Sequence, residues 1–154
     1  MEELFRNKGI FAPVDQMMAQ LKATADKFGL PMGSRTQTFN SRLAQELGLW
    51  AQDEGQGHAF HMAAFQAYFV DGRNIAKTEV LLDLVRQCGL DPAQAQAVLD
   101  QRSYKDAVDA DWQASRDQNI MAAPTYIMGE HRLVGAQSHE KLVWLMEQNA
   151  AAAR

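Results

Sequence analysis

Apolar residues in most of this chain recur at intervals of three and four, which is the period of a helix that buries one face. Between Val14 and Phe28, for example, they fall at Val14, Met17, Met18, Leu21 and Ala25. Only from Pro124 to Val134 does the pattern change to short apolar runs typical of strands. The spacing therefore predicts a mainly α fold with a single C-terminal β-hairpin.

Capping and stop residues divide the periodic part into seven predicted helices. We expect them at 14–28, from the Asn40 cap to the glycines at 55 and 57, at 58–70, from the Thr78 cap to Gly89, from the Asp91 cap through Leu99, at 103–119, and from the Ser138 cap through Met146. Helix 58–70 has apolar residues on more than one face, so it should be largely buried.

The predicted hairpin joins residues 124–128 to residues 131–134 through Gly129-Glu130, a dipeptide that suits a two-residue turn with glycine first. A two-stranded hairpin alone is only marginally stable in water. Ile127, Leu133 and Val134 therefore need a sheet partner or a helix cover. The sequence offers helices for this cover but no third strand.

Composition excludes several classes of protein. The 154 residues are 47% hydrophobic with a formal net charge of −4, which argues against disorder and against nucleic acid as the main partner. No apolar run approaches the roughly 18–20 residues that span a bilayer, and the N-terminal residues lack an apolar signal core. We expect a cytoplasmic protein without membrane contact.

The single cysteine, Cys88, allows neither an internal disulfide nor a cysteine-cluster metal site. It lies on the apolar stripe of helix 78–89, so it is interpreted as a small buried hydrophobe rather than a reactive thiol. His58 and His61 share a helix face, but two ligands do not complete a tetrahedral metal site. His131 and His139 should face solvent. We expect no metal and no cofactor, because no phosphate-binding glycine loop or zinc-protease motif occurs.

One segment differs from this background. Ala123-Pro124-Thr125 follows a predicted helix directly and opens a β-run, a place where proline is tolerated because no ladder hydrogen bond is needed. Only about 5–6% of X–Pro bonds in folded proteins are cis, so the residues alone favour a trans bond at Pro124.

The order of helix, Ala123-Pro124-Thr125, strand, turn, strand, Gly135-Ala136-Gln137 and final helix resembles the C-terminal half of a DsbA-like thioredoxin fold, an α/β family. The stretches 40–44, 64–69 and 80–84 are similar to FrnE-like dithiol–disulfide isomerases, relatives of 2-hydroxychromene-2-carboxylate isomerase. The resemblance covers roughly residues 12 to 147. It implies a single incomplete DsbA-like domain over 1–154, with a helical insertion at 14–119, and the cis-proline strand, hairpin strand and final helix at 120–148.

The resemblance also implies a function, disulfide oxidation or isomerisation. Ala123, a cis Pro124 and Thr125 would bind the substrate, a peptide or a glutathione-like thiol. Family members begin with a strand, a Cys-x-x-Cys pair and a further strand, which this chain does not contain. A dithiol cycle needs an attacking and a resolving thiol. We therefore expect no catalytic residue here and no dithiol activity from the chain as given.

Three explanations for the missing unit stay open: a shortened form of an active parent, a natural variant that kept the binding half, or a chain completed by a second one. Two alternative functions also stay open, a relative of glutathione-dependent isomerases or transferases and a noncatalytic helical dimer or adaptor. Without its neighbouring strand, Thr125 to Met128 would be an exposed apolar edge, and such edges recruit partners. We expect a homodimer that buries Ile127, Leu142, Leu145 or Met146.

Overall fold

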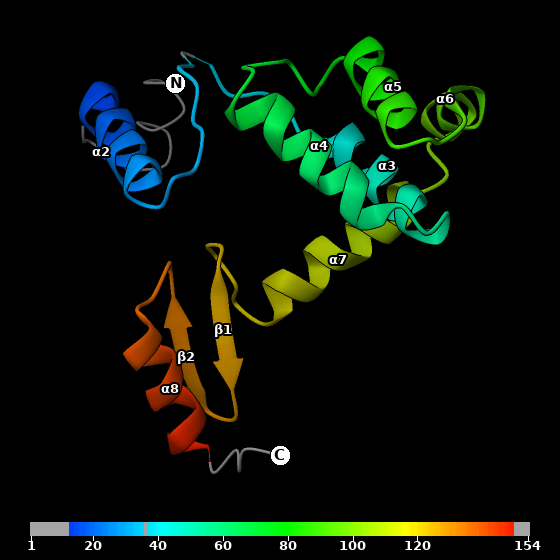
Figure 1. The fold of residues 1–154 in the computed structure, drawn as a ribbon. Coiled ribbons are helices and arrows are strands. Elements are labelled where there is room, and N and C mark those ends of the chain that lie inside the picture. The colour runs from blue at the N-terminus through cyan, green and yellow to red at the C-terminus, as the bar shows by residue number, and fades with distance from the viewer. Residues whose placement is uncertain (1–12, 36, 150–154) are drawn as a thin grey trace. The chain divides into compact units, whose positions relative to one another are not determined.

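The computed structural model describes residues 13–35 and 37–149 and confirms a mainly helical chain with one C-terminal hairpin (Figure 1). The elements, in chain order, are α2 (Val14–Lys27), α3 (Arg42–Asp53), α4 (Gly57–Phe69), α5 (Thr78–Gln87), α6 (Pro92–Gln101), α7 (Lys105–Asp117), β1 (Thr125–Met128), β2 (His131–Val134) and α8 (His139–Gln148). None of these helices is long and apolar enough to cross a membrane.

The chain forms two compact units, residues 1–108 and 109–154, and α7 crosses the boundary between them. In the first unit, α3 packs against α4, α5 and α6. Its core contains Leu47, Phe60 and Leu81, each fully buried. Burying a side chain of this size contributes about 1.5–3 kcal/mol, so each of these three residues stabilises the first unit. No residue of α2 is buried.

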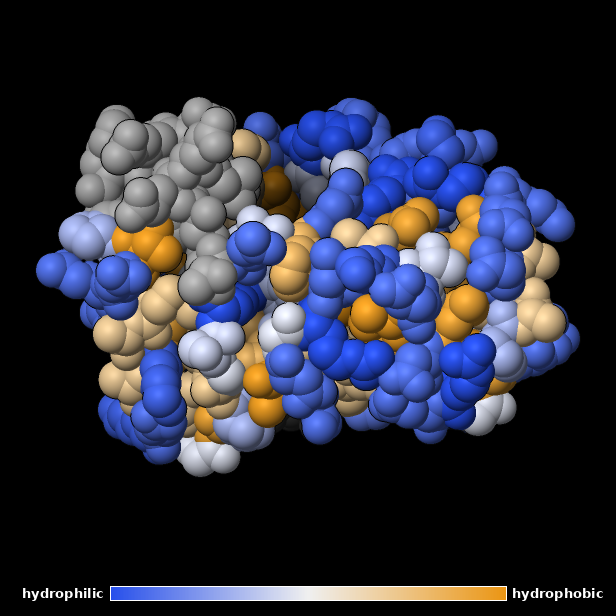
Figure 2. Space-filling view, turned by 90° about the horizontal axis from the view of Figure 1, so that it is seen from above, coloured by the Kyte–Doolittle hydropathy of each residue, from blue (hydrophilic) through white to orange (hydrophobic). Residues whose placement is uncertain are grey.

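The expectation that helix 58–70 would be largely buried is wrong. Phe60 and Ala67 are the buried residues of α4, whereas Met62, Phe65 and Phe69 are 53%, 56% and 40% exposed. These three residues follow one another at helical spacings of three and four, so they line one side of α4 that stays largely exposed. On the face in Figure 2, hydrophobic side chains reach the surface in several separate places among polar ones.

Two of the predicted caps are confirmed in detail. The Asp91 carboxylate accepts the Ala93 backbone N–H at 2.8 Å, with Pro92 at the first helical position of α6. Gly89, just after α5, has the left-handed φ of +73° that its position requires.

Three other helix starts differ from the prediction by one or two residues. Thr78 is the first residue of α5 rather than its cap. The helix expected from Ser103 begins at Lys105. Asn40 lies one residue before the N-cap Ser41, and its side chain accepts the backbone N–H of Arg42 at 2.9 Å. Asn40 thus still satisfies one unpaired donor at the start of α3.

In the second unit, β1 and β2 form an antiparallel pair in which Met128 lies opposite His131. Only two residues separate the strands, and Gly129 has a φ of +56°, as a hairpin turn with glycine first requires. Helix α8 packs against β2 (Figure 1). Leu145 is the buried residue of α8, while Met146 is 46% exposed.

Candidate functional site

Residues 122–125 form a turn that leads into β1. The Ala123–Pro124 peptide bond is cis, and both residues are exposed. The Thr125 hydroxyl donates to the Ala122 carbonyl at 2.6 Å, and the Gly135 N–H donates to the Pro124 carbonyl at 2.8 Å. The Pro124 backbone is therefore bonded to the end of β2, while Ala123 and Pro124 stay exposed and Thr125 is half-buried.

The hydrogen-bond pattern fixes which backbone groups point away from the hairpin. The bond from Gly135 to Pro124 makes the next opposed pair, Thr125 and Val134, a non-hydrogen-bonded pair. The pattern alternates, so Ile127 and Arg132 are also such a pair. Thr125 and Ile127 therefore direct their N–H and C=O groups to the outer edge of β1. Within residues 13–35 and 37–149, no strand pairs with that edge.

The two faces of the hairpin differ in cover. On one face, Ile127 is 43% and Val134 51% exposed. On the other face, the His131 ring meets the Trp144 ring of α8 edge-on, with 5.6 Å between centroids. The expectation that His131 faces solvent is therefore wrong, because α8 covers its face of the hairpin. The apolar cover that the hairpin needs is present on that side alone among the described residues.

Arg132 holds the segment between α7 and β1, a role that the sequence reading did not assign. From β2 its guanidinium donates to the Gln118 carbonyl at 2.6 Å and to the Asn119 carbonyl at 2.7 Å. Asn119 has a left-handed φ of +53°, which ends the helix and turns the chain toward Pro124. The segment before Pro124 is thereby fixed at its start by β2.

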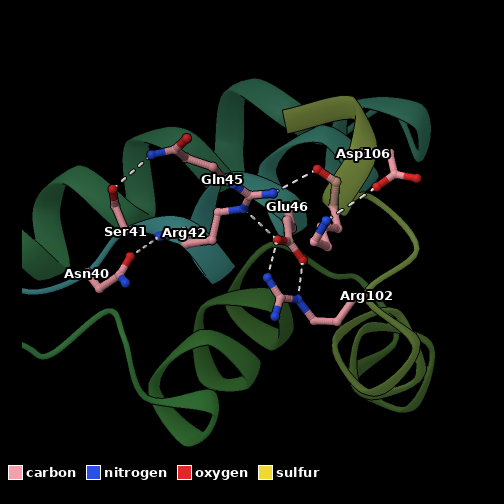
Figure 3. A network of polar contacts seen from close by, with 8 residues as sticks. Asn40, Ser41, Arg42, Gln45, Glu46, Arg102 and Asp106 are labelled. Atoms are coloured by element: carbon pink, nitrogen blue, oxygen red, sulfur yellow. Dashed lines mark hydrogen bonds and ion pairs between the residues drawn. The ribbon is translucent and has the colours of Figure 1, made fainter. Parts of the chain in front are cut away.

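A second polar site, which the sequence did not predict, is a triad around a buried carboxylate in the first unit (Figure 3). Glu46 of α3 is fully buried. Its carboxylate accepts from Nε of Arg42 at 2.8 Å, and from Nε and Nη2 of Arg102 at 2.8 and 2.6 Å. These bonds, led by those from Arg102, hold the pKa of Glu46 below its usual value. The triad joins α3 to the left-handed residue that ends α6.

The triad borders a cavity of about 250 Å³ lined by Asn40, Arg42, Leu43, Ala76 and Arg102. One sequence signal could have located its carboxylate. Glu46 lies three residues after Leu43 and four before Trp50, so it falls on the apolar stripe of α3. A charged residue on such a stripe must find a partner when the helix packs.

The remaining candidates show no catalytic arrangement in the part of the chain that the structure describes. Cys88 is half-buried against the α3–α6 core, and burial raises the pKa of its thiol. His58 and His61 are exposed, as is His139. Among the described residues, no three histidine, cysteine or acidic side chains gather to form a metal site.

Comparisons with known proteins agree with this architecture. A curated relative, the uncharacterized protein YwbO of Bacillus subtilis (strain 168), is 34% identical over 95 residues, which are 61% of this chain and 48% of YwbO. The chain thus spans about half the length of that relative.

Two solved structures share the fold. A probable DsbA oxidoreductase from Streptomyces coelicolor has a TM-score of 0.81 at 24% identity, with 99% of this chain and 68% of that protein covered. A 2-hydroxychromene-2-carboxylate isomerase has a TM-score of 0.71 at 19% identity, with 99% and 80% covered. Residues 6–147 match the family described as DSBA-like thioredoxin domain. The predicted family is therefore confirmed, and the chain belongs to the DSBA-like thioredoxin domain family.

Proposed function

We propose that this chain supplies the substrate-binding half of a DsbA-like thiol–disulfide oxidoreductase or isomerase. In this proposal Ala123, Pro124 and Thr125, with the outer edge of β1, receive an extended peptide or a glutathione-like thiol. The observation that carries the proposal is the outer edge of β1, which no described strand pairs with, beside the exposed Ala123 and Pro124. Family membership and the predicted domain plan, an insertion at 14–119 followed by the unit at 120–148, support it.

The edge has the groups that such a ligand needs. An extended peptide binds to a sheet edge by pairing its backbone with outward N–H and C=O groups, here those of Thr125 and Ile127. Pro124 has no N–H and its carbonyl already accepts from Gly135, so the outward backbone groups of the edge begin at Thr125. The uncovered side chain of Ile127 would add apolar contact.

The same proposal excludes dithiol turnover by these 154 residues alone. They contain one cysteine, and thiol–disulfide cycling needs two thiols. The raised pKa of the Cys88 thiol further lowers its thiolate fraction at neutral pH. In an insulin-reduction assay, the native chain and Cys88→Ser should both show no turnover. Turnover that disappears with Cys88→Ser would contradict the assignment of the chain as a binding half.

A titration followed by backbone NMR tests binding at the edge, with oxidised glutathione and a short extended peptide as probes. We expect the Thr125 and Ile127 amide signals to shift saturably. Ile127→Pro removes an outward N–H without removing a bond to β2, so it should weaken peptide binding. Ile127→Ala keeps that N–H and controls for the side chain. Equal binding by Ile127→Pro and Ile127→Ala would show that the edge does not pair with the ligand.

The free edge and the exposed Ile127 also support the proposal of a homodimer in which two β1 edges pair. Light scattering at micromolar concentration should give the mass of a dimer for the native chain and that of a monomer for Ile127→Pro. A monomeric native chain would refute this interface. The single cysteine, which permits no internal disulfide, fits the further proposal of a cytoplasmic location.

A noncatalytic adaptor is the second candidate function. The observation that favours it is the uncovered apolar side of α4, formed by Met62, Phe65 and Phe69. Loss of the dimer in Phe65→Asp, with no change in Ile127→Pro, would favour an adaptor that works through α4. A third candidate function is that of a relative of glutathione-dependent isomerases or transferases. The NMR titration with oxidised glutathione tests it.

A further inference from the structure

Arg35 lies in the loop between α2 and α3 with its guanidinium over two aromatic rings. Its Cζ atom is 4.3 Å from the centroid of the Tyr68 ring and 4.8 Å from that of the Phe69 ring. Both rings belong to α4, and they meet each other edge-on with 4.8 Å between centroids. Cation–π contacts of this kind fix the plane of the guanidinium group.

The loop before Arg35 is fixed to the same end of α4. The Gly33 N–H donates to the Phe69 carbonyl at 2.9 Å. A Cβ atom at Gly33 would overlap the carbonyl oxygen of Val70, so this backbone approach requires glycine. The position of Arg35 is thus set by backbone contacts as well as by ring stacking.

The charge of Arg35 has no counter-charge in the described part of the chain. Its Nε and Nη1 atoms are buried and have no hydrogen-bond partner there. Leaving a buried charged donor unpaired is unfavourable. A group that accepted these bonds would recover this energy, so the site favours a ligand with negatively charged oxygens.

A cavity of about 390 Å³ adjoins the group and is lined by Ser34, Arg35, Gln37, Phe39 and Gly72. Its described lining residues provide one cation, a hydroxyl, an amide and an aromatic wall, and none of them is acidic. Asp71, next to Gly72 in sequence, is exposed. Phe39 contacts Tyr68 edge-on, with 6.2 Å between ring centroids, so the wall is continuous with the rings below Arg35.

We propose that Arg35 and this cavity bind a small oxyanion, the carboxylate or phosphate group of a low-molecular-weight ligand. The oxyanion accepts from Nη1, the terminal guanidinium nitrogen that has no partner among the described residues, while Ser34 and Gln37 supply further donors. Arginine is suited to this role because its planar fork matches the geometry of both groups. All residues of this site belong to the first unit, so the proposal does not depend on the β1 edge of the proposed function.

NMR titrations with inorganic phosphate and with benzoate, against sodium chloride at equal ionic strength, test the site. We expect saturable shifts of the Arg35 Nε–H and Gly72 amide signals, with the tighter probe showing whether phosphate or carboxylate is preferred. Arg35→Gln should weaken the tighter probe by about tenfold or more. Arg86→Gln, which removes an exposed arginine of α5, is the control for net charge and should leave the midpoint unchanged.

Shifts that grow linearly with concentration, or that saturate equally in native chain and Arg35→Gln, would overturn the proposal. If the NMR spectrum shows that Arg35→Gln is unfolded, Arg35→Lys is the variant to titrate instead. That variant keeps the charge but not the planar fork, so it should bind more weakly than the native chain. An unchanged midpoint in a folded Arg35→Lys would equally overturn the role assigned to the guanidinium.

Discussion

Replacing Glu46 by glutamine should destabilise the first unit strongly. The substitution conserves volume but removes the negative charge that pairs with Arg42 and Arg102 at 2.6–2.8 Å. Breaking a buried ion pair by removing one partner costs about 3–5 kcal/mol. The Arg102 side chain is 42% exposed and can regain water, whereas that of Arg42 is only 15% exposed. We therefore expect a loss at the lower end, about 3 kcal/mol.

The surface pair of Arg73 and Asp83 provides a matched control. Its N···O distance is also 2.6 Å, but the two side chains are 31% and 44% exposed. Solvent screening reduces such pairs to about 0–1 kcal/mol, so Asp83→Asn should cost little. Urea unfolding followed by circular dichroism measures the free energy of unfolding of both variants and the native chain. The m-value should stay constant, because the surface exposed on unfolding does not change.

The two ion pairs differ mainly in the burial of their carboxylates. Equal losses of stability in Glu46→Gln and Asp83→Asn, or a loss of less than about 1 kcal/mol in Glu46→Gln, would refute the predicted effect of burial. A second check is the double variant Glu46→Gln/Arg102→Gln. It should be more stable than the sum of the single losses predicts, since each single change leaves a partner unpaired.

Three further predictions concern pH, backbone space and the thiol. Because the pKa of Glu46 is lowered in the folded chain, its ion pairs stabilise the fold fully at pH values above the usual glutamate pKa of about 4.3. This stabilisation is lost as the pH falls through the lowered pKa. In acid, the free energy of unfolding of the native chain should therefore approach that of Glu46→Gln. Gly33→Ala should lower the free energy of unfolding by about 1–3 kcal/mol, because the added Cβ overlaps the Val70 carbonyl. Gly55 lies in open space with a φ of +74°, so Gly55→Ala should lower it by about 1–2 kcal/mol through backbone conformation alone. The NMR chemical shifts of Val70 should change in Gly33→Ala and not in Gly55→Ala. Cys88 should react with a thiol reagent faster in urea than when folded, and equal rates would contradict its burial.

Local signals in the sequence predicted the elements well. Asp91-Pro92 and Gly129 specify a helix start and a hairpin turn through neighbouring atoms, and both appear as expected. Helix type and approximate bounds also followed, because the apolar period is a property of consecutive residues. The Ala123-Pro124-Thr125 segment could be recognised from its order among these elements.

Features that depend on distant residues were not predictable in the same way. Glu46 and Arg102 are 56 positions apart, and no local pattern pairs them. The exposure of Phe65 and Phe69 was missed because composition shows that a helix is apolar but not which neighbours cover it. His131 was wrongly expected to face solvent, because the Trp144 ring that contacts it comes from α8, a separate element.

The position of Arg132 links the β1 edge to the end of α7. Arg132 is the register partner of Ile127, whose outward groups form the free edge, and its guanidinium binds the carbonyls of Gln118 and Asn119. Pairing of a ligand with the outer edge of β1 restricts the backbone of the hairpin that carries Arg132. We therefore expect binding at β1 to slow hydrogen exchange at residues 116–119, next to the carbonyls that Arg132 holds. Unchanged exchange there in a saturated complex would refute this coupling.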